Sequence, residues 1–128
     1  MARPKFARRV FLVAGLYGIV VLAPQYFVEL GLPALIDRPE HFYGFIGVAL
    51  AWQAILLIVA SDVVRYRPLM LAAVLEKVSF GAAVAVLYAA GRVSSGVLLA
   101  GTLDLILGAL FVAAFTATPS GRAVLQPE

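Results

Sequence analysis

Long apolar runs separated by short polar segments dominate this chain. Four runs cover about residues 10–30, 42–60, 68–90 and 94–116. The hydrocarbon core of a bilayer, about 30 Å thick, is crossed by roughly 20 apolar residues of helix. None of the runs alternates apolar and polar residues as the strands of a membrane barrel do. The pattern therefore predicts an all-α integral membrane protein, in which residues 1–128 form a single domain of four transmembrane helices.

Composition agrees with this prediction and removes several kinds of site. Apolar residues make up 63% of the chain and charged residues 13%, whereas soluble proteins have roughly 45–50% and about 25%. The chain has no cysteine and a single histidine, His41. Disulfide scaffolds, thiolate metal sites and haem or zinc centres with several histidines are therefore excluded. We expect neither a cofactor nor a bound metal.

Basic residues gather at alternate ends of the runs. One side has Arg3, Lys5, Arg8, Arg9, Arg65, Arg67 and Arg122, and the other has Arg38 and Arg92. Short cytoplasmic loops carry the excess of Lys and Arg, which predicts cytoplasmic termini and an up-down-up-down bundle in the inner (plasma) membrane. The basic N-terminus also resembles a secretory signal, but no A-x-A cleavage site follows, so we expect a retained first helix. We interpret the basic residues as orienting the helices and contacting lipid, and we expect no nucleic-acid partner.

Small and polar residues recur at helical spacing within each run, as they do where membrane helices pack closely. The predicted inward faces are Gly15 and Gly18 in the first run; Ala49, Gln53 and Ala60 in the second; Ala72, Glu76, Ser79 and Ala83 in the third; and Gly101, Asp104 and Gly108 in the fourth. We expect Gly101 and Gly108 to allow close contact with a neighbouring helix. The third and fourth helices should be neighbours because their link is short, and Pro24 should kink the first helix.

Three ionisable residues lie inside the third and fourth runs, where charges are costly and indicate function by default. They are Glu76, Lys77 and Asp104, with Gln53 and Ser79 as neutral companions. Helical rise places Lys77 and Asp104 at compatible depths for an ion pair, with Gln53 within reach. If Glu76 also points inward, two acids compete for one base, and one should hold a proton because burial disfavours the charged form.

This polar cluster has two interpretations. It forms either a structural ion pair that fixes the helix register, or a pocket that binds a headgroup, a proton or a small amphipathic ligand.

Two smaller groups of polar residues lie in the loops. Asp37, Glu40 and His41 could bind a divalent metal, but their loose spacing and single imidazole favour a solvated loop. In the other loop, Asp62 could pair with Arg65 across one helical turn. Arg65 and Arg67 are predicted to contact anionic lipid or a partner protein, or to anchor the loop in the cytoplasm.

No catalytic motif is present. The chain lacks the pattern of a hydrolase triad, a Gly-rich phosphate loop or a dinucleotide-binding fingerprint. Acid–base chemistry would have to use Glu76 or Asp104. We therefore expect a protein that is not an enzyme and has no catalytic residue.

Several short segments resemble known small membrane proteins. They are His41-Phe-Tyr-Gly-Phe-Ile-Gly, Arg65-Tyr-Arg-Pro-Leu-Met-Leu, Leu75-Glu-Lys and Gly91-Arg-Val. Together with the number of spans, they resemble small bacterial four-helix proteins of the DoxX-like kind over roughly residues 40–115. The resemblance implies a four-helix bundle and an accessory subunit of a membrane redox or transport complex. It implies no catalytic residue.

Two functions follow from these observations. The first is an accessory or scaffold subunit that docks onto other membrane proteins or onto copies of itself. The alternative is a binder or carrier of a small lipophilic or amphipathic ligand, with possible coupling to a proton. Small multidrug exporters carry a Glu in the first span, whereas Glu29 lies near the end of this one. A cavity beside Glu76 and Asp104 would favour the carrier, and a sealed, fully paired core would favour the scaffold.

Overall fold

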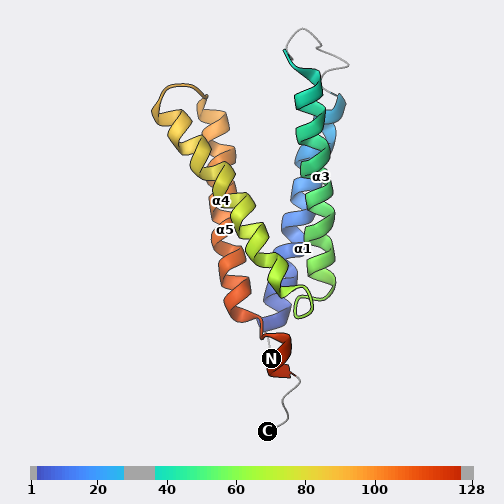
Figure 1. The fold of residues 1–128 in the computed structure, drawn as a ribbon. Helices are drawn as coiled ribbons and strands as arrows, with labels where there is room; N and C mark the ends of the chain where they lie inside the picture. The colour runs from blue at the N-terminus through green and yellow to red at the C-terminus, as the bar shows by residue number, and fades with distance from the viewer. Residues whose placement is uncertain (1–2, 28–36, 125–128) are drawn as a thin grey trace.

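The computed structural model describes residues 3–27 and 37–124, which are all-helical in their regular structure (Figure 1). The elements are α1 (Arg3–Leu22), the 3₁₀ helix η1 (Ala23–Phe27), α3 (Pro39–Ser61), α4 (Arg67–Ala89), α5 (Ser95–Ala117) and the short α6 (Gly121–Val124). Four helices are long and apolar enough to cross a membrane, with η1 extending the first of them. The predicted all-α fold with four possible membrane spans is confirmed.

The bounds of three long helices lie close to the predicted spans. α3, α4 and α5 begin at residues 39, 67 and 95 and end at 61, 89 and 117, against predicted starts of 42, 68 and 94 and ends of 60, 90 and 116. Proline stands in the first turn of both α3 and α4, where its missing N–H breaks no helical hydrogen bond. α5 begins after Ser94, whose Oγ accepts a hydrogen bond from the Val97 N–H at 3.4 Å.

The first helix departs most from its prediction. α1 begins at residue 3 instead of residue 10, because the basic segment is made of good helix formers and continues the helix beyond the apolar run. At the other end, α-helical geometry stops at Leu22, and Pro24 lies within η1. The predicted break at Pro24 is thus a change to a tighter helix. Glu29 and the rest of the segment 28–36 lie outside the described residues.

The four long helices form two pairs, and the pairs diverge (Figure 1). α1 packs along α3, and α4 packs along α5, while α3 and α4 touch little. The two pairs meet at the end where α1 begins and α5 ends, and they separate towards the other end, so the fold has the shape of a V. The pairs of the predicted four-helix bundle are therefore in contact at one end and apart at the other (Figure 1).

An apolar core holds the pairs together at the narrow end. It is formed by Ala7, Phe11 and Ala14 of α1, Leu56, Val59 and Ala60 of α3, Val63 of the α3–α4 connection, Met70 and Ala73 of α4, and Phe111 and Ala114 of α5. The rings of Phe11 and Phe111 stack with centroids 4.4 Å apart, which joins α1 to α5. Stacked aromatic pairs add about 0.5–1.5 kcal/mol beyond the area they bury.

Arg67 ties the start of α4 to the end of α5. Its Nε donates hydrogen bonds to the carbonyl oxygens of Phe115, at 3.2 Å, and Thr118, at 2.8 Å. Its guanidinium carbon also lies 3.7 Å from the centroid of the Phe115 ring. A cation at the C-terminus of a helix satisfies the last carbonyls and complements the helix dipole. Arg67 thus binds within the protein, and its predicted contact with lipid or a partner stays a prediction.

Glycines allow α4 and α5 to approach closely. A Cβ added to Gly101 would lie 2.6 Å from Val84 Cγ1, and one added to Gly108 would lie 3.3 Å from Lys77 Cβ. A Cβ on Gly81 would come within 3.0 Å of the Gly101 carbonyl oxygen. The structure thus places Gly101 and Gly108 in the tight contact expected of them, with α4 as the partner.

The packed face of α4 differs from the predicted one. The buried residues are Met70, Ala73, Lys77, Gly81 and Val84. Ala72, Ser79 and Ala83 are exposed and Glu76 is half-buried, so the predicted inward stripe is wrong by a rotation of about 100°, which is one residue of helix. The reason is that Lys77 and Gly81, one turn apart, fit against the two glycines of α5.

Candidate functional site

A cleft of about 530 Å³ lies between the two helix pairs. It is lined by Tyr17, Gly18, Val21 and Leu22 of α1, Gln25 of η1, Phe45, Ala49 and Gln53 of α3, Glu76, Lys77 and Phe80 of α4, and Ser94, Gly96, Val97, Ala100 and Asp104 of the α5 region. Every long helix therefore contributes to its wall. The lining residues come from both helix pairs, which diverge towards one end (Figure 1).

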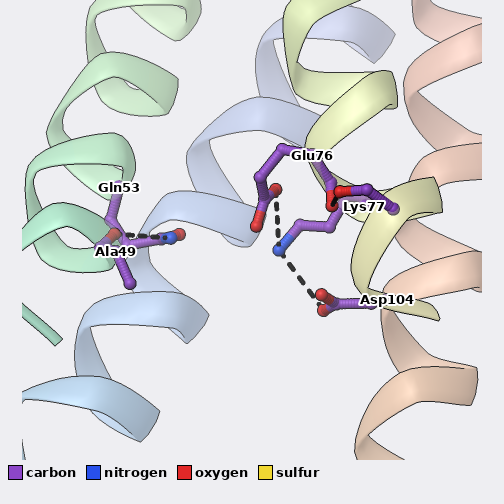
Figure 2. Close-up of polar contacts among 6 residues, drawn as sticks. Ala49, Gln53, Glu76, Lys77 and Asp104 are labelled. Carbon is purple, nitrogen blue, oxygen red and sulfur yellow. Dashed lines mark hydrogen bonds and ion pairs between the residues drawn. The ribbon is translucent and has the colours of Figure 1, made fainter. Parts of the chain in front are cut away.

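An ion cluster stands in the cleft near the middle of α4 and α5. Lys77 Nζ lies 3.3 Å from Asp104 Oδ1 and 3.3 Å from Glu76 Oε2, so one ammonium lies between two carboxylates (Figure 2). The Lys77 side chain is only 8% exposed, compared with 17% for Asp104 and 37% for Glu76. The predicted Lys77–Asp104 pair is confirmed. Glu76 competes for the same base, as expected if both acids face the cleft.

Gln53 stands on the opposite wall, on α3. Its Nε2 donates to the carbonyl oxygen of Ala49 at 3.0 Å (Figure 2), and the residue is only 3% exposed. Its Oε1 is buried and has no hydrogen-bond partner in the part of the chain that the structure describes. Gly18 makes room for this side chain, because a Cβ there would collide with the Gln53 amide. Gln53 thus shares the cleft with the ion cluster, but its amide donates to its own helix.

The residues that line the cleft carry a net negative formal charge and are otherwise mostly apolar. Among the described residues that line it, the charged ones are Glu76, Lys77 and Asp104, whose formal charges of −1, +1 and −1 sum to −1. Much of the remaining lining is aromatic or aliphatic, including Tyr17, Phe45 and Phe80. An apolar pocket with a few convergent polar groups is the usual form of a small-molecule site.

The remaining predicted polar residues lie away from the cleft. Ser79 is exposed, and its Oγ donates to the Glu76 carbonyl oxygen at 3.0 Å, so it does not join the ion cluster. Arg65 is exposed, with its guanidinium carbon 5.5 Å from the Tyr66 ring centroid. The Asp62 carboxylate accepts a hydrogen bond from the backbone N–H of Arg65 at 3.1 Å, where the sequence suggested a side-chain pair.

The residues predicted to form a solvated loop are open to solvent, but Glu40 and His41 lie in the first turn of α3 instead of a loop. His41 Nε2 lies 3.7 Å from Glu40 Oε1, with side chains 69% and 70% exposed. Within residues 3–27 and 37–124, no three His, Cys, Asp or Glu residues are placed to hold a metal ion.

Sequence reasoning missed the aromatic lining and one glycine, Gly81, and it named Gly18 without the residue that it makes room for. Tyr17, Phe45 and Phe80 face the cleft, but an aromatic ring facing lipid has the same sequence pattern. Gly18 had been placed on a packing face without its partner, Gln53. Gly81 could have been found, because it follows Lys77 by one helical turn and so lies on the same face.

Comparison of the chain with models of known protein families, with characterised proteins and with solved structures finds no match. The resemblance to DoxX-like proteins therefore stays a prediction from the sequence. The function of the cleft has to follow from the residues that line it.

Proposed function

We propose that this protein binds a small amphipathic molecule in the cleft between its helix pairs and acts as a binder or carrier in the membrane. The observation that carries the proposal is an open cleft with a charged cluster inside it. A sealed, fully paired core was the expectation for a scaffold. The volume of about 530 Å³ lies within the range of roughly 300–1,000 Å³ typical of ligand sites.

The cleft suits a molecule with one polar and one apolar end. The ion cluster and Gln53 would face the polar end, and the rings of Phe45 and Phe80 would contact the apolar body. Such a ligand could enter sideways from the lipid, because the helix pairs diverge. No step of this function requires a reaction.

The proposed orientation places both termini in the cytoplasm, with four spans running up-down-up-down through the inner membrane. The basic residues near the narrow end, including Lys5 and Arg65, support it through the positive-inside rule. The wide end of the cleft would then face the outer leaflet. In intact cells, an impermeant thiol reagent should label Glu40→Cys but not Lys5→Cys. The chain has no native cysteine, so the reverse labelling would contradict the orientation directly.

Photocrosslinking in membranes tests ligand binding. A long-chain alcohol carrying a diazirine should label Phe45, Phe80 or Val97 in preference to lipid-facing residues, as read by mass spectrometry of the peptides. Ala100→Trp should abolish this labelling, because Ala100 is exposed in the cleft and the new ring would fill it. Ala109→Trp is the matched control on α5, since Ala109 is exposed outside the cleft lining. Labelling spread evenly over all outward residues would contradict the proposal.

An accessory subunit is the second proposal. Large apolar side chains are exposed along the outer faces, such as Val20 at 72% and Leu75 at 69%, and they are available to lipid or to another membrane protein. Purification from the native membrane in mild detergent, with identification of bound proteins and lipids, separates the two proposals. A stoichiometric protein partner supports the subunit, and retained small amphiphiles support the carrier.

A further inference from the structure

We infer that the ligand of the cleft is an organic cation with N–H donors, a protonated amine joined to an apolar body. This inference rests on the proposed function and names the chemistry of the ligand. Three observations on the cleft lead to it: the net charge of its lining, the kind of polar atom left without a partner, and the aromatic character of its walls.

The charge of the lining favours a cation. Lys77 is the only cation among the described lining residues, and it is already shared by Glu76 and Asp104. With both acids ionised, one negative charge remains uncompensated in a site walled by apolar side chains; without a cation in the cleft, one acid has to hold a proton instead. An uncompensated charge removed from water is costly, so a monovalent cation would stabilise the cluster. An anionic headgroup would add a second negative charge and face two carboxylates.

The unpartnered polar atoms favour a donor. Two buried oxygens of the lining, Gln53 Oε1 and Glu76 Oε2, have no hydrogen-bond partner within residues 3–27 and 37–124. Glu76 Oε2 lies within ion-pair distance of Lys77 but outside hydrogen-bond geometry. The orientation of the Gln53 amide is fixed, because its other end meets a carbonyl oxygen and must be the NH₂ group. Both unpartnered atoms are acceptors that lie just beneath the cleft surface, so a ligand that donates hydrogen bonds would satisfy them once their side chains rotate towards the cleft.

The aromatic walls favour the same ligand. The rings of Tyr17, Phe45 and Phe80 line the cleft, and aromatic faces attract cations as well as apolar chains. The ammonium could belong to a free lipophilic amine or to the headgroup of phosphatidylethanolamine. The two sources share this chemistry, and they are separated by the vesicles used in the test.

Competition against the photoreactive alcohol tests the inference in phosphatidylcholine vesicles. The competitors are octylammonium, octyltrimethylammonium, octanol and octanoate, each corrected for its partition into protein-free vesicles. Octylammonium should compete at about tenfold lower concentration than octyltrimethylammonium, which has the charge but no N–H donor, since a charged hydrogen bond contributes about 1.5 kcal/mol or more. Octanoate should compete worst. Equal competition by octylammonium and octanoate would overturn the inference.

Variants of the carboxylates supply the control. Glu76→Gln brings the formal charge of the cluster to zero and should remove the preference for octylammonium over octanol. Glu40→Gln makes the same change at an exposed site outside the cleft and should preserve the preference. If both variants kept the preference for octylammonium over octanol, the inference would also be overturned.

Vesicles that contain phosphatidylethanolamine identify the source of the cation. If this lipid displaces the alcohol from the cleft, the ligand is a lipid headgroup; if only octylammonium does so, it is a free amine. If neither competes, the inference fails. Cleft labelling by the alcohol with no preference for a cation would refute the inference and leave the proposed function standing. The absence of any cleft labelling would refute the proposed function itself.

Discussion

The Lys77–Asp104 pair offers the most informative stability experiment. The perturbation is a double-mutant cycle with Lys77→Met, Asp104→Asn and the combination. Met keeps the length of the lysine stem and Asn keeps the shape of the carboxylate, so neither variant opens a large cavity. Each removes one charge from a pair whose atoms lie 3.3 Å apart.

The structure makes the two single costs unequal. Lys77→Met leaves both carboxylates without their base, and breaking a buried pair costs about 3–5 kcal/mol. We expect the lower end, about 3 kcal/mol, because the Asp104 and Glu76 side chains keep 17% and 37% exposure. Asp104→Asn should cost less, about 1 kcal/mol, because Lys77 retains Glu76 at 3.3 Å. The double variant should cost about 1–2 kcal/mol less than the sum of the single variants.

Equilibrium unfolding in mixed detergent micelles measures these costs. The helical signal in circular dichroism and the fluorescence of Trp52, the single tryptophan of the chain, can follow the same transition. Costs that simply add would show that the two residues do not interact. A cost of Asp104→Asn equal to that of Lys77→Met would show that Glu76 does not share the ammonium.

Two further predictions concern packing and one concerns a helix cap. Gly101→Leu should destabilise the fold by about 1–3 kcal/mol or more, because a Cβ there would lie 2.6 Å from a Val84 side-chain carbon, while Gly44→Leu, with no atom within 4 Å of the new Cβ, should unfold like the wild type. Phe11→Ala should lower the free energy of unfolding by about 3 kcal/mol, the low end for loss of an aromatic ring. The low end applies because the ring stays in contact with detergent, and not water, when the chain unfolds. An unchanged unfolding midpoint would contradict the stacked core. Arg67→Gln should cost about 1.5 kcal/mol through loss of charged hydrogen bonds to two carbonyl oxygens of the α5 terminus, and a cost near zero would show that the cap contributes nothing.

The sequence predicted the helices well because span length is a property of each segment alone. The apolar runs placed the bounds of α3, α4 and α5 within three residues. The start of α1 was missed because hydropathy marks where a helix enters lipid and not where its hydrogen bonds begin. The depth argument for Lys77 and Asp104 succeeded for a similar reason, since helical rise is fixed.

The rotation of α4 and the opening of the V were not predictable in this way. Two stripes of α4, one through Glu76 and one through Lys77, both contain small residues, and only the fit to Gly101 and Gly108 distinguishes them. In lipid, every apolar face is equally well solvated, so hydrophobicity does not determine which helices close against one another. The cleft depends on this undetermined angle between the helix pairs, and its aromatic lining was missed with it.

The openness of the cleft in a bilayer is the central claim, and a pair of distances between spin labels tests it most directly. Labels at Glu40→Cys, at the start of α3, and Arg92→Cys, between α4 and α5, report the wide end of the V; labels at Ser61→Cys and Thr116→Cys, at the ends of α3 and α5, report the narrow end (Figure 1). All four positions are exposed, and the chain has no other cysteine. In nanodiscs, double electron–electron resonance should give a clearly longer distance for the first pair than for the second. Equal distances at the two ends would mean that the four helices close into a parallel-sided bundle and that the cleft does not exist.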